Sequence, residues 1–129
     1  APSGGASPAP SAAAPTAAPS LSLPIVFKPN SAQLRPESGA MLGSLVAAML
    51  STELQNQRFV IEGHTDASGS AAQNLRLSKE RAEQVRLYLV TLGVAGERLR
   101  AVGKGASEPV NAADPRAAEN RRVRVVAAP

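Results

Sequence analysis

Two oppositely charged side chains in the middle of the chain are candidates to share one small site. Asp66 ends the hexapeptide Ile61-Glu62-Gly63-His64-Thr65-Asp66, and Arg81 lies within a run from Asn74 to Leu89. The apolar residues that follow Arg81 recur at helical spacing and form one stripe: Ala82, Val85 and Leu89. Because that stripe faces a core, Arg81 must point elsewhere, toward whatever the segment ending in Asp66 presents.

A carboxylate and a guanidinium held close together suit the binding of an amino-acid head, which carries an ammonium and a carboxylate. Asp66 can accept hydrogen bonds from the ammonium, while the fork of Arg81 can bind the carboxylate through two parallel bonds. Backbone N–H groups at the start of the helix would add donors for the same carboxylate. A plain salt bridge between Asp66 and Arg81 that stabilises the turn explains the pair equally well.

A metal-dependent alternative comes from the alternation of Glu62, His64 and Asp66. In a strand that stayed extended, all three would project from one face, and this set could hold a divalent ion for a metal-assisted hydrolase. However, His64 is the only histidine of the chain, and no second ligand cluster accompanies it. We therefore expect a structural role for His64, hydrogen-bonded at a strand end, with no bound metal and no other cofactor.

Nucleophilic catalysis has less support in the sequence. The chain has no cysteine, no second histidine to act as a base, and no Gly-x-Ser-x-Gly segment. The segment Gly103-Lys104-Gly105 lacks the spacing of a phosphate-binding loop and is typical of a turn. We therefore expect a protein that binds its ligand and is not an enzyme.

Composition divides the 129 residues into a tail and one domain. Residues 1–20 consist only of Ala, Pro, Ser, Gly and Thr, and they lack the large apolar side chains that compensate the entropy of ordering. We predict a disordered linker over 1–20 and a domain over 21–129, with its folded part from about Leu21 to Val126. At roughly 3 Å per residue, such a linker could reach on the order of 60 Å.

The formal charge of +4, with eleven arginines and three lysines, permits an acidic partner. The aromatic residues that single-strand nucleic-acid binding requires are few and widely separated: Phe27, Phe59 and Tyr88. We expect no nucleic-acid partner. The longest apolar run, Leu45 to Leu50, is far too short to cross a bilayer, so any membrane attachment is expected through an anchor outside this chain.

The periodicity of apolar residues predicts four strands and two main helices. The expected strands are Leu23–Phe27, Arg58–His64, Leu99–Val102 and Arg121–Val126. One expected helix begins at Pro36, and the other spans Asn74 to Leu92. A short helical turn is expected to begin at Asp114-Pro115. This order predicts a two-layer α/β sandwich, a mixed four-stranded sheet with helices on one face.

Two details of the helices also follow from the pattern. In the first helix the buried face should comprise Met41, Leu42, Leu45, Val46, Met49 and Leu50. The second helix should end before Gly93, while its N-cap is either Asn74 or Ser78. In the last strand, Val123 and Val125 should face one way, and Arg122 and Arg124 the other.

The chain resembles the OmpA-like C-terminal domain, the peptidoglycan-binding module also found in peptidoglycan-associated lipoproteins and in the flagellar stator protein MotB. The resemblance rests on Asn-x-x-Leu-Ser-x-x-Arg-Ala-x-x-Val-x-x-x-Leu from Asn74 to Leu89 and on the hexapeptide that precedes it. Two flanking motifs, Phe27-x-x-Asn30-Ser31 and Asn120-Arg121-Arg122-Val123, occur in the expected order. The similarity covers about Leu23 to Val126.

This resemblance implies non-covalent binding of the diaminopimelate in the peptidoglycan stem peptide. By position, Asp66 would take the ligand ammonium and Arg81 its carboxylate. Further hydrogen bonds would come from Asn30, Ser68 and Asn74, and secondary contacts from Thr65, Arg121 and Arg122. With the long tail, the resemblance implies a periplasmic tether of an outer-membrane lipoprotein or of an envelope machine. The alternative is a docking module for another envelope protein, with peptidoglycan binding incidental.

Overall fold

A mixed four-stranded sheet forms one layer of the fold. The computed structural model describes residues 20–23, 25, 27 and 31–128. The strands are β1 (Ser20–Leu23), β2 (Arg58–His64), β3 (Leu99–Gly103) and β4 (Arg122–Ala128). They lie in the order β1-β4-β2-β3, in which β2 and β3 are parallel and the other two pairs are antiparallel.

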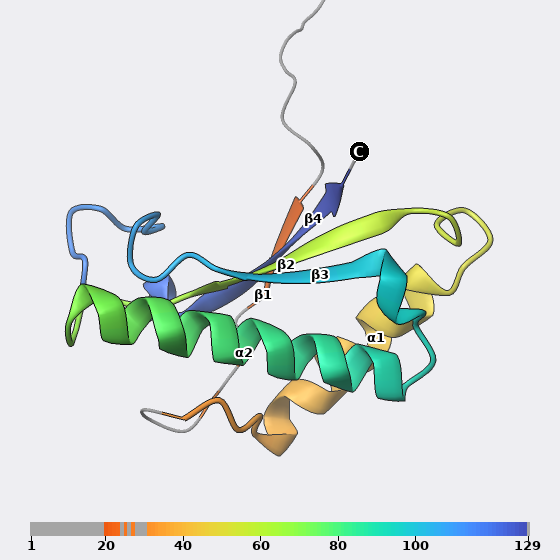
Figure 1. The fold of residues 1–129 in the computed structure, drawn as a ribbon, viewed down its shortest axis with the longest axis horizontal. Helices are drawn as coiled ribbons and strands as arrows, with labels where there is room; N and C mark the ends of the chain where they lie inside the picture. Colours follow the sequence, from red (N-terminus) through yellow and green to blue (C-terminus); the bar gives the residue numbers. More distant parts are fainter. Residues whose placement is uncertain (1–19, 24, 26, 28–30, 129) are drawn as a thin grey trace, which may run out of the picture.

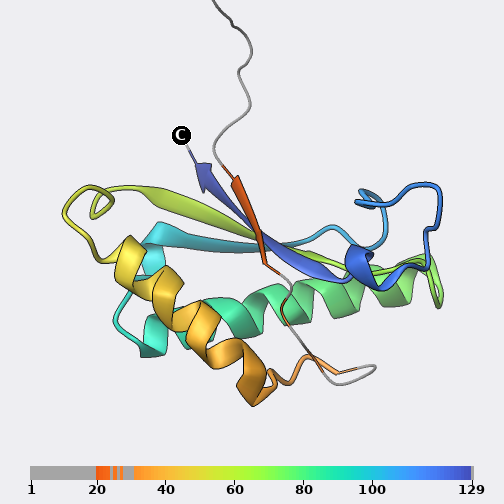
Figure 2. The ribbon, with the colours of Figure 1, turned by 180° about the vertical axis from the view of Figure 1, so that it is seen from behind.

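Two helices form the second layer, and both pack on the same face of the sheet (Figures 1 and 2). Helix α1 spans Gly39–Met49 after a 3-10 turn at Pro36–Ser38, and α2 spans Ala71–Thr91. The largest fully buried apolar side chains lie between the layers: Leu42, Met49, Ile61, Val85, Leu89, Val94 and Val123. The predicted two-layer α/β sandwich is therefore confirmed. Within the described residues, no helix is both long and apolar enough to cross a membrane.

Alternation along the strands explains which residues enter the core. Phe59 and Ile61 of β2 are buried, while Val60 between them is only partly so. In β4, Val123 and Val125 are buried, while Arg122 and Arg124 are only partly buried, as the period of two predicts.

Glycine allows the start of α2 to lie directly against the sheet. A Cβ on Gly63 would be 2.0 Å from the carbonyl oxygen of Ser78, and a Cβ on Gly103 would be 2.7 Å from the Ser78 Oγ. Ser78 is fully buried, and its hydroxyl donates to the Leu75 carbonyl and accepts from the Gly105 N–H. This close contact brings the first turns of α2 next to the end of β2, where the candidate site lies.

The first strand differs from its prediction. β1 begins at Ser20, which we placed in the linker, and ends at Leu23, where we expected the strand to begin. Pro24 lacks a backbone donor, which disfavours continued pairing with β4. Phe27 instead forms an isolated bridge with Leu34. The predicted linker otherwise lies outside the described residues, as does Asn30.

The helix boundaries also need correction. Leu50 follows the last residue of α1 and is 49% exposed, so it does not belong to the buried face; Met41 and Leu45 are partly buried. Helix α2 begins one turn earlier than predicted, with Ser70 as its N-cap, because the Ser70 Oγ accepts from the Gln73 N–H at 3.1 Å. Asn74 and Ser78 are therefore interior positions.

The segment before β4 is a turn that begins at Asp114-Pro115, where a short helical turn was predicted, followed by a 3-10 helix. The Asp114 side chain accepts from the Arg116 N–H, and its carbonyl accepts from the Ala117 N–H. The 3-10 helix spans Ala118–Asn120, and β4 starts at Arg122, one residue later than predicted. Arg121 is thus left between two elements with its side chain available to the site.

Candidate functional site

A cavity of about 870 Å³ opens where β2 ends and α2 begins. These two ends lie at the left of Figure 1. The described residues that line it are Ile25, Phe27, Arg35, His64, Thr65, Asp66, Ser68, Gly69, Gln73, Asn74, Leu77, Arg81, Ala118, Arg121 and Arg122. Every predicted site residue in the described part of the chain is among them. Segments far apart in the sequence therefore converge here, as the predicted shared site requires.

Asp66 is the carboxylate of this cavity, and it is 7% exposed. Its Oδ1 accepts hydrogen bonds from the N–H of Ser68 at 2.9 Å and from the Ser68 hydroxyl. Its Oδ2 lies 2.6 Å from Nη1 of Arg121. Burial opposes ionisation, but these donors outweigh it, so the pKa of Asp66 lies below its ordinary value. Asp66 is therefore a carboxylate at neutral pH.

Arg81 lies in α2 and is 6% exposed. Its Nε donates to the Ser31 carbonyl at 2.9 Å, and its guanidinium carbon lies 4.8 Å from the centre of the Phe27 ring. Burial and the nearby Arg121 lower the pKa of Arg81, whereas Asp66 raises it. Arginine nevertheless stays charged near neutrality. The ring and the carbonyl fix the plane of this guanidinium.

The structure adds Arg121 to the centre of the site. Its side chain is half exposed, yet it forms the ion pair with Asp66. The buried amide of Asn120 orders the preceding loop, because its Nδ2 donates to the carbonyls of Asp114 and Pro115. The Pro115 carbonyl accepts from the N–H of Ala67, next to Asp66. This loop therefore holds Arg121 and Asp66 together.

The remaining predicted residues lie around this pair. Asn74 is buried in the first turns of α2, and Thr65 is buried with a hydroxyl that has no hydrogen-bond partner among the described residues. Arg122 borders the cavity, but its Nη1 donates to Ser22 and its Nη2 to the Glu108 carbonyl, which directs the side chain toward the strands.

Sequence reasoning missed three features of the cavity wall. It left Arg121 as a secondary contact, and it did not assign roles to Phe27 or to the carbonyl of Ser31. The motif Phe27-x-x-Asn30-Ser31 was a signal for the last two, since both contact Arg81. Nothing local to Arg121 indicates its pairing with Asp66.

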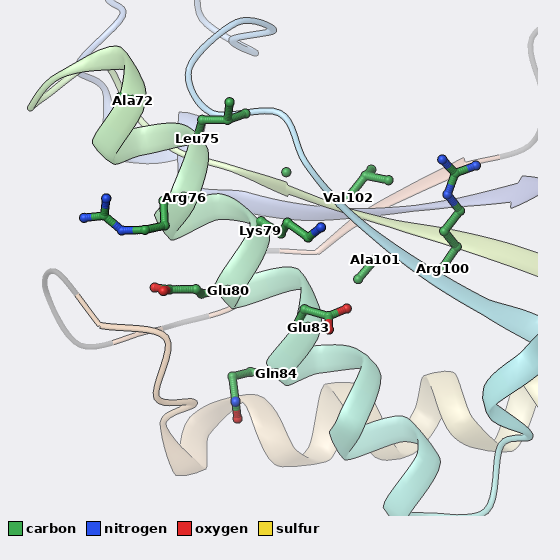
Figure 3. A pocket seen from close by; sticks show the side chains of 11 residues that line it. Ala72, Leu75, Arg76, Lys79, Glu80, Glu83, Gln84, Arg100, Ala101 and Val102 are labelled. Atoms are coloured by element: carbon green, nitrogen blue, oxygen red, sulfur yellow. The ribbon is translucent and has the colours of Figure 1, made fainter.

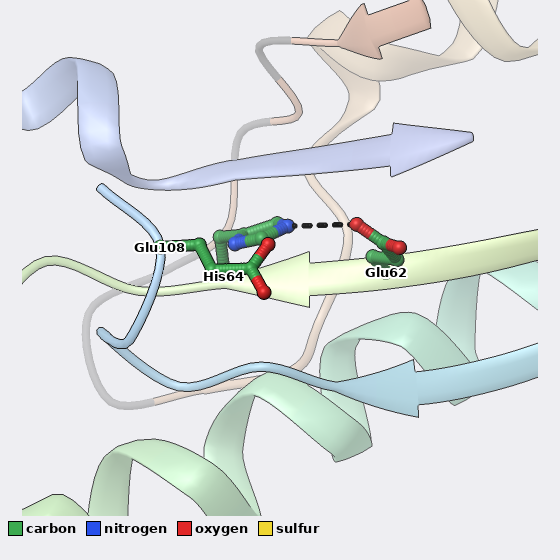
Figure 4. Close-up of side chains that lie close together, drawn as sticks. All are labelled: Glu62, His64 and Glu108. Carbon is green, nitrogen blue, oxygen red and sulfur yellow. Dashed lines mark hydrogen bonds and ion pairs between the residues drawn. The ribbon is translucent and has the colours of Figure 1, made fainter. Parts of the chain in front are cut away.

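The structure separates Asp66 from the other two residues of the metal hypothesis. His64 Nε2 lies 3.2 Å from Glu62 Oε1, and Glu108, not Asp66, is the third nearby ligand group (Figure 4). Burial lowers the pKa of His64, against the raising effect of Glu62, so the imidazole is neutral at pH 7. Arg124 lies 3.4 Å from Glu62, and Lys104 lies 3.8 Å from Glu108. These cations already compensate both carboxylates.

The fold defines a small two-layer α/β domain with a polar cavity, and comparison with known proteins identifies its family. Residues 26–123 match the model of the OmpA family. The chain belongs to the OmpA family.

Individual relatives support this assignment. Outer membrane protein P5 of Haemophilus influenzae is 36% identical over 94 residues, which cover 73% of this chain and 26% of that protein. Outer membrane protein A of Yersinia pseudotuberculosis is 37% identical over 86 residues, 67% of this chain and 24% of that protein. The chain therefore spans about a quarter of the length of these relatives.

Solved structures share the fold. The peptidoglycan-associated lipoprotein from Burkholderia pseudomallei has a TM-score of 0.70 at 30% identity, and the match covers 83% of this chain and 89% of that one. The cell wall anchor of the type VI secretion system from Pseudomonas aeruginosa has a TM-score of 0.65 at 28% identity, covering 81% and 76%. Both likenesses extend over most of the described domain.

Proposed function

We propose that the cavity binds the free amino-acid head of diaminopimelate in peptidoglycan stem peptides, by non-covalent contacts and without catalysis. The chain would thereby tether an outer-membrane or other envelope protein to the cell wall, with this domain in the periplasm. Two structural relatives, a peptidoglycan-associated lipoprotein and a cell wall anchor, support this class of ligand.

The observation that carries the proposal is the convergence of two guanidiniums on one carboxylate. Arg121 forms an ion pair with Asp66, and both charges act on Arg81, because Arg121 lowers the pKa of Arg81 and Asp66 raises it. The excess cation is complementary to a ligand carboxylate, while Asp66 supplies the acceptor for a ligand ammonium. A zwitterion satisfies both requirements, whereas a simple cation or a simple anion satisfies only one.

The geometry supports a proposed role for each residue. Arg81 would bind the ligand carboxylate, because its stacking on Phe27 and its bond to Ser31 pre-organise its plane. The ammonium would bind Asp66, whose second oxygen Arg121 occupies in the free protein. Arg121 would then turn toward the ligand carboxylate, since its half-exposed side chain can move. Ser68 and Asn74 would add hydrogen bonds, and Asn30 is proposed from the family resemblance.

Co-sedimentation with purified sacculi of the diaminopimelate type tests the proposal. We expect Asp66→Ala and Arg81→Ala to lose sedimentation, and free diaminopimelate to compete with the intact chain. Because both residues are buried, Asp66→Asn provides a variant of the same shape, and circular dichroism checks each fold. Sedimentation by folded Asp66→Asn and Arg81→Ala at the level of the unchanged chain would refute the proposed site.

The alternative, a docking module for an envelope protein, predicts a different result. Its partner would remain bound after the peptidoglycan is digested with a muramidase, whereas a partner bridged only by peptidoglycan would be released.

A further inference from the structure

One edge of the sheet is open and borders a second hollow. β3 is the last strand in the order β1-β4-β2-β3, so only β2 pairs with it. A groove of about 770 Å³ runs between β3 and α2 (Figure 3). It shares no lining residue with the cavity around Asp66. Both could therefore be occupied at once.

The direction of the backbone groups along β3 follows from two hydrogen bonds. The Lys104 N–H donates to the Gly63 carbonyl of β2, whereas the Leu99 carbonyl accepts from Arg86 Nε of α2. Successive residues of a strand direct their backbone groups to opposite edges. The N–H and C=O of Ala101 therefore face away from β2, at the edge of the sheet beside the groove.

These outward groups have no partner in the described part of the chain. No turn bond and no side-chain bond uses the N–H or C=O of Ala101, and the same holds for the outward N–H of Gly103. Arg86 covers the edge only at Leu99. An unpaired edge of this kind is a template for an added strand, since main-chain bonds supply the affinity.

Side chains beside the edge indicate what such a strand would carry. Lys79 reaches from α2 toward Val102, and Arg100 projects from β3 on the other side (Figure 3). Neither cation forms an ion pair with another described residue. Leu75, which is 54% exposed, offers an apolar surface at one end of the groove. Two acidic residues, Glu80 and Glu83, also line the groove on α2. A segment that alternates aliphatic and acidic residues would complement this surface, with its carboxylates near Lys79 and Arg100 and away from these two.

A second copy of the chain fits less well. Antiparallel pairing of two β3 edges around Ala101 would place the two Arg100 side chains in diagonal positions on one face, about 7–8 Å apart. Like charges at that separation oppose pairing. The charge of the edge therefore favours a different, acidic chain.

We propose that the outer edge of β3 accepts an extended acidic segment of a partner protein as a fifth strand of the sheet. The segment would be short, because pairing is open only around Ala101 and Gly103. This docking site shares no residue with the proposed peptidoglycan cavity. A negative result for one proposal therefore does not affect the other.

Amide hydrogen exchange measured by NMR tests the proposal on the full chain. The probe is a blocked seven-residue peptide that alternates valine and aspartate. At 90% saturation we expect exchange of the Ala101 amide to slow about tenfold. A peptide N-methylated on the residues whose amides face β3 should give no protection, while one methylated on the opposite edge should still bind. Equal behaviour of the two methylated peptides would overturn the proposal.

Two variants complete the test. Ala101→Pro removes the outward N–H donor but no hydrogen bond to β2, and edge strands tolerate proline at such a position. This variant should abolish peptide binding. Arg100→Glu leaves the backbone unchanged and should favour a valine–lysine peptide over the aspartate one. Protection of Ala101 without peptide that rises with protein concentration would point to a second copy. Protection of the Ala101 amide without peptide that disappears when residues 1–19 are deleted would indicate that this segment occupies the edge. Either result would overturn the assignment to a partner.

Discussion

Replacing Arg81 by lysine separates the shape of the guanidinium from its charge. Lysine keeps a cation in the cavity, but it lacks the planar fork that the proposed ligand carboxylate would use. Of two parallel charge-assisted hydrogen bonds, one would remain. A hydrogen bond of this type contributes about 1.5–3 kcal/mol, so we expect Arg81→Lys to weaken binding of a diaminopimelate-containing muropeptide by roughly 10- to 150-fold.

The same substitution should also reduce stability by a calculable amount. It removes the bond from Arg81 Nε to the Ser31 carbonyl, worth about 1 kcal/mol, and weakens the stacking on Phe27 by about 0.5–1 kcal/mol. For a domain of about 100 residues, this loss corresponds to a fall in Tm of roughly 6–16 °C. Affinity is therefore measured by isothermal titration calorimetry at 15 °C, where the variant stays folded.

Arg86→Lys is a matched control on the same helix. Arg86 makes comparable bonds, to the carbonyls of Leu99 at 3.0 Å and of Gly96 at 2.9 Å, but it lies outside the cavity. Its loss should lower the Tm and leave muropeptide affinity unchanged. If Arg81→Lys and Arg86→Lys bind equally well, the assignment of Arg81 to the ligand carboxylate is wrong.

Three further predictions concern the scaffold. Because folding lowers the pKa of Asp66, its carboxylate stabilises the fold above pH ~4, and this stabilisation is lost as the pH falls through the folded-state pKa. Urea unfolding from pH 7 to pH 3 should therefore show that the difference in unfolding free energy between the unchanged chain and Asp66→Asn disappears at low pH. A difference that stays constant with pH would contradict this prediction. Gly63→Ala should destabilise by at least about 1–3 kcal/mol, since its Cβ would meet the Ser78 carbonyl, whereas Gly43→Ala in α1, with open space around it, should stabilise by about 0.5–1 kcal/mol. Asn120→Ala should cost about 2–4 kcal/mol and weaken sacculus binding as its loop loosens, which thermal unfolding and sedimentation would show.

The periodic parts of the fold were predictable from the sequence because each carries its signal locally. Strand β2 has the predicted bounds, Arg58–His64, and the buried Phe59 and Ile61 alternate with less buried neighbours over its first half. Helix α2 ends at Thr91, one residue before the predicted end, and Gly93 lies just beyond it with a left-handed φ of 114°, as predicted. Its start was missed because Ser70, Asn74 and Ser78 are all capable caps, and only the packing of the first turn on the sheet selects Ser70.

The residues that line the candidate site could be predicted from the sequence, but the hydrogen bonds and ion pairs between them could not. Asp66 and Arg81 line one cavity, as their spacing suggested. The bond between Asp66 and Arg121, however, joins residues 55 apart in sequence, and it depends on how Asn120 orders the loop before β4. Such pairings follow from tertiary packing, which no local pattern of residue types encodes.

The central claim is that the cavity recognises a free zwitterionic head. Diaminopimelate ends in such a head, whereas lysine, which replaces it in other peptidoglycans, ends in an ammonium alone. Calorimetric titration of the chain with two muropeptides that differ only in this residue is therefore the most direct test. We predict binding of the diaminopimelate form that is lost in Asp66→Asn, with at least tenfold weaker binding of the lysine form. Equal affinity for the two muropeptides would contradict the proposed recognition by Asp66 and Arg81.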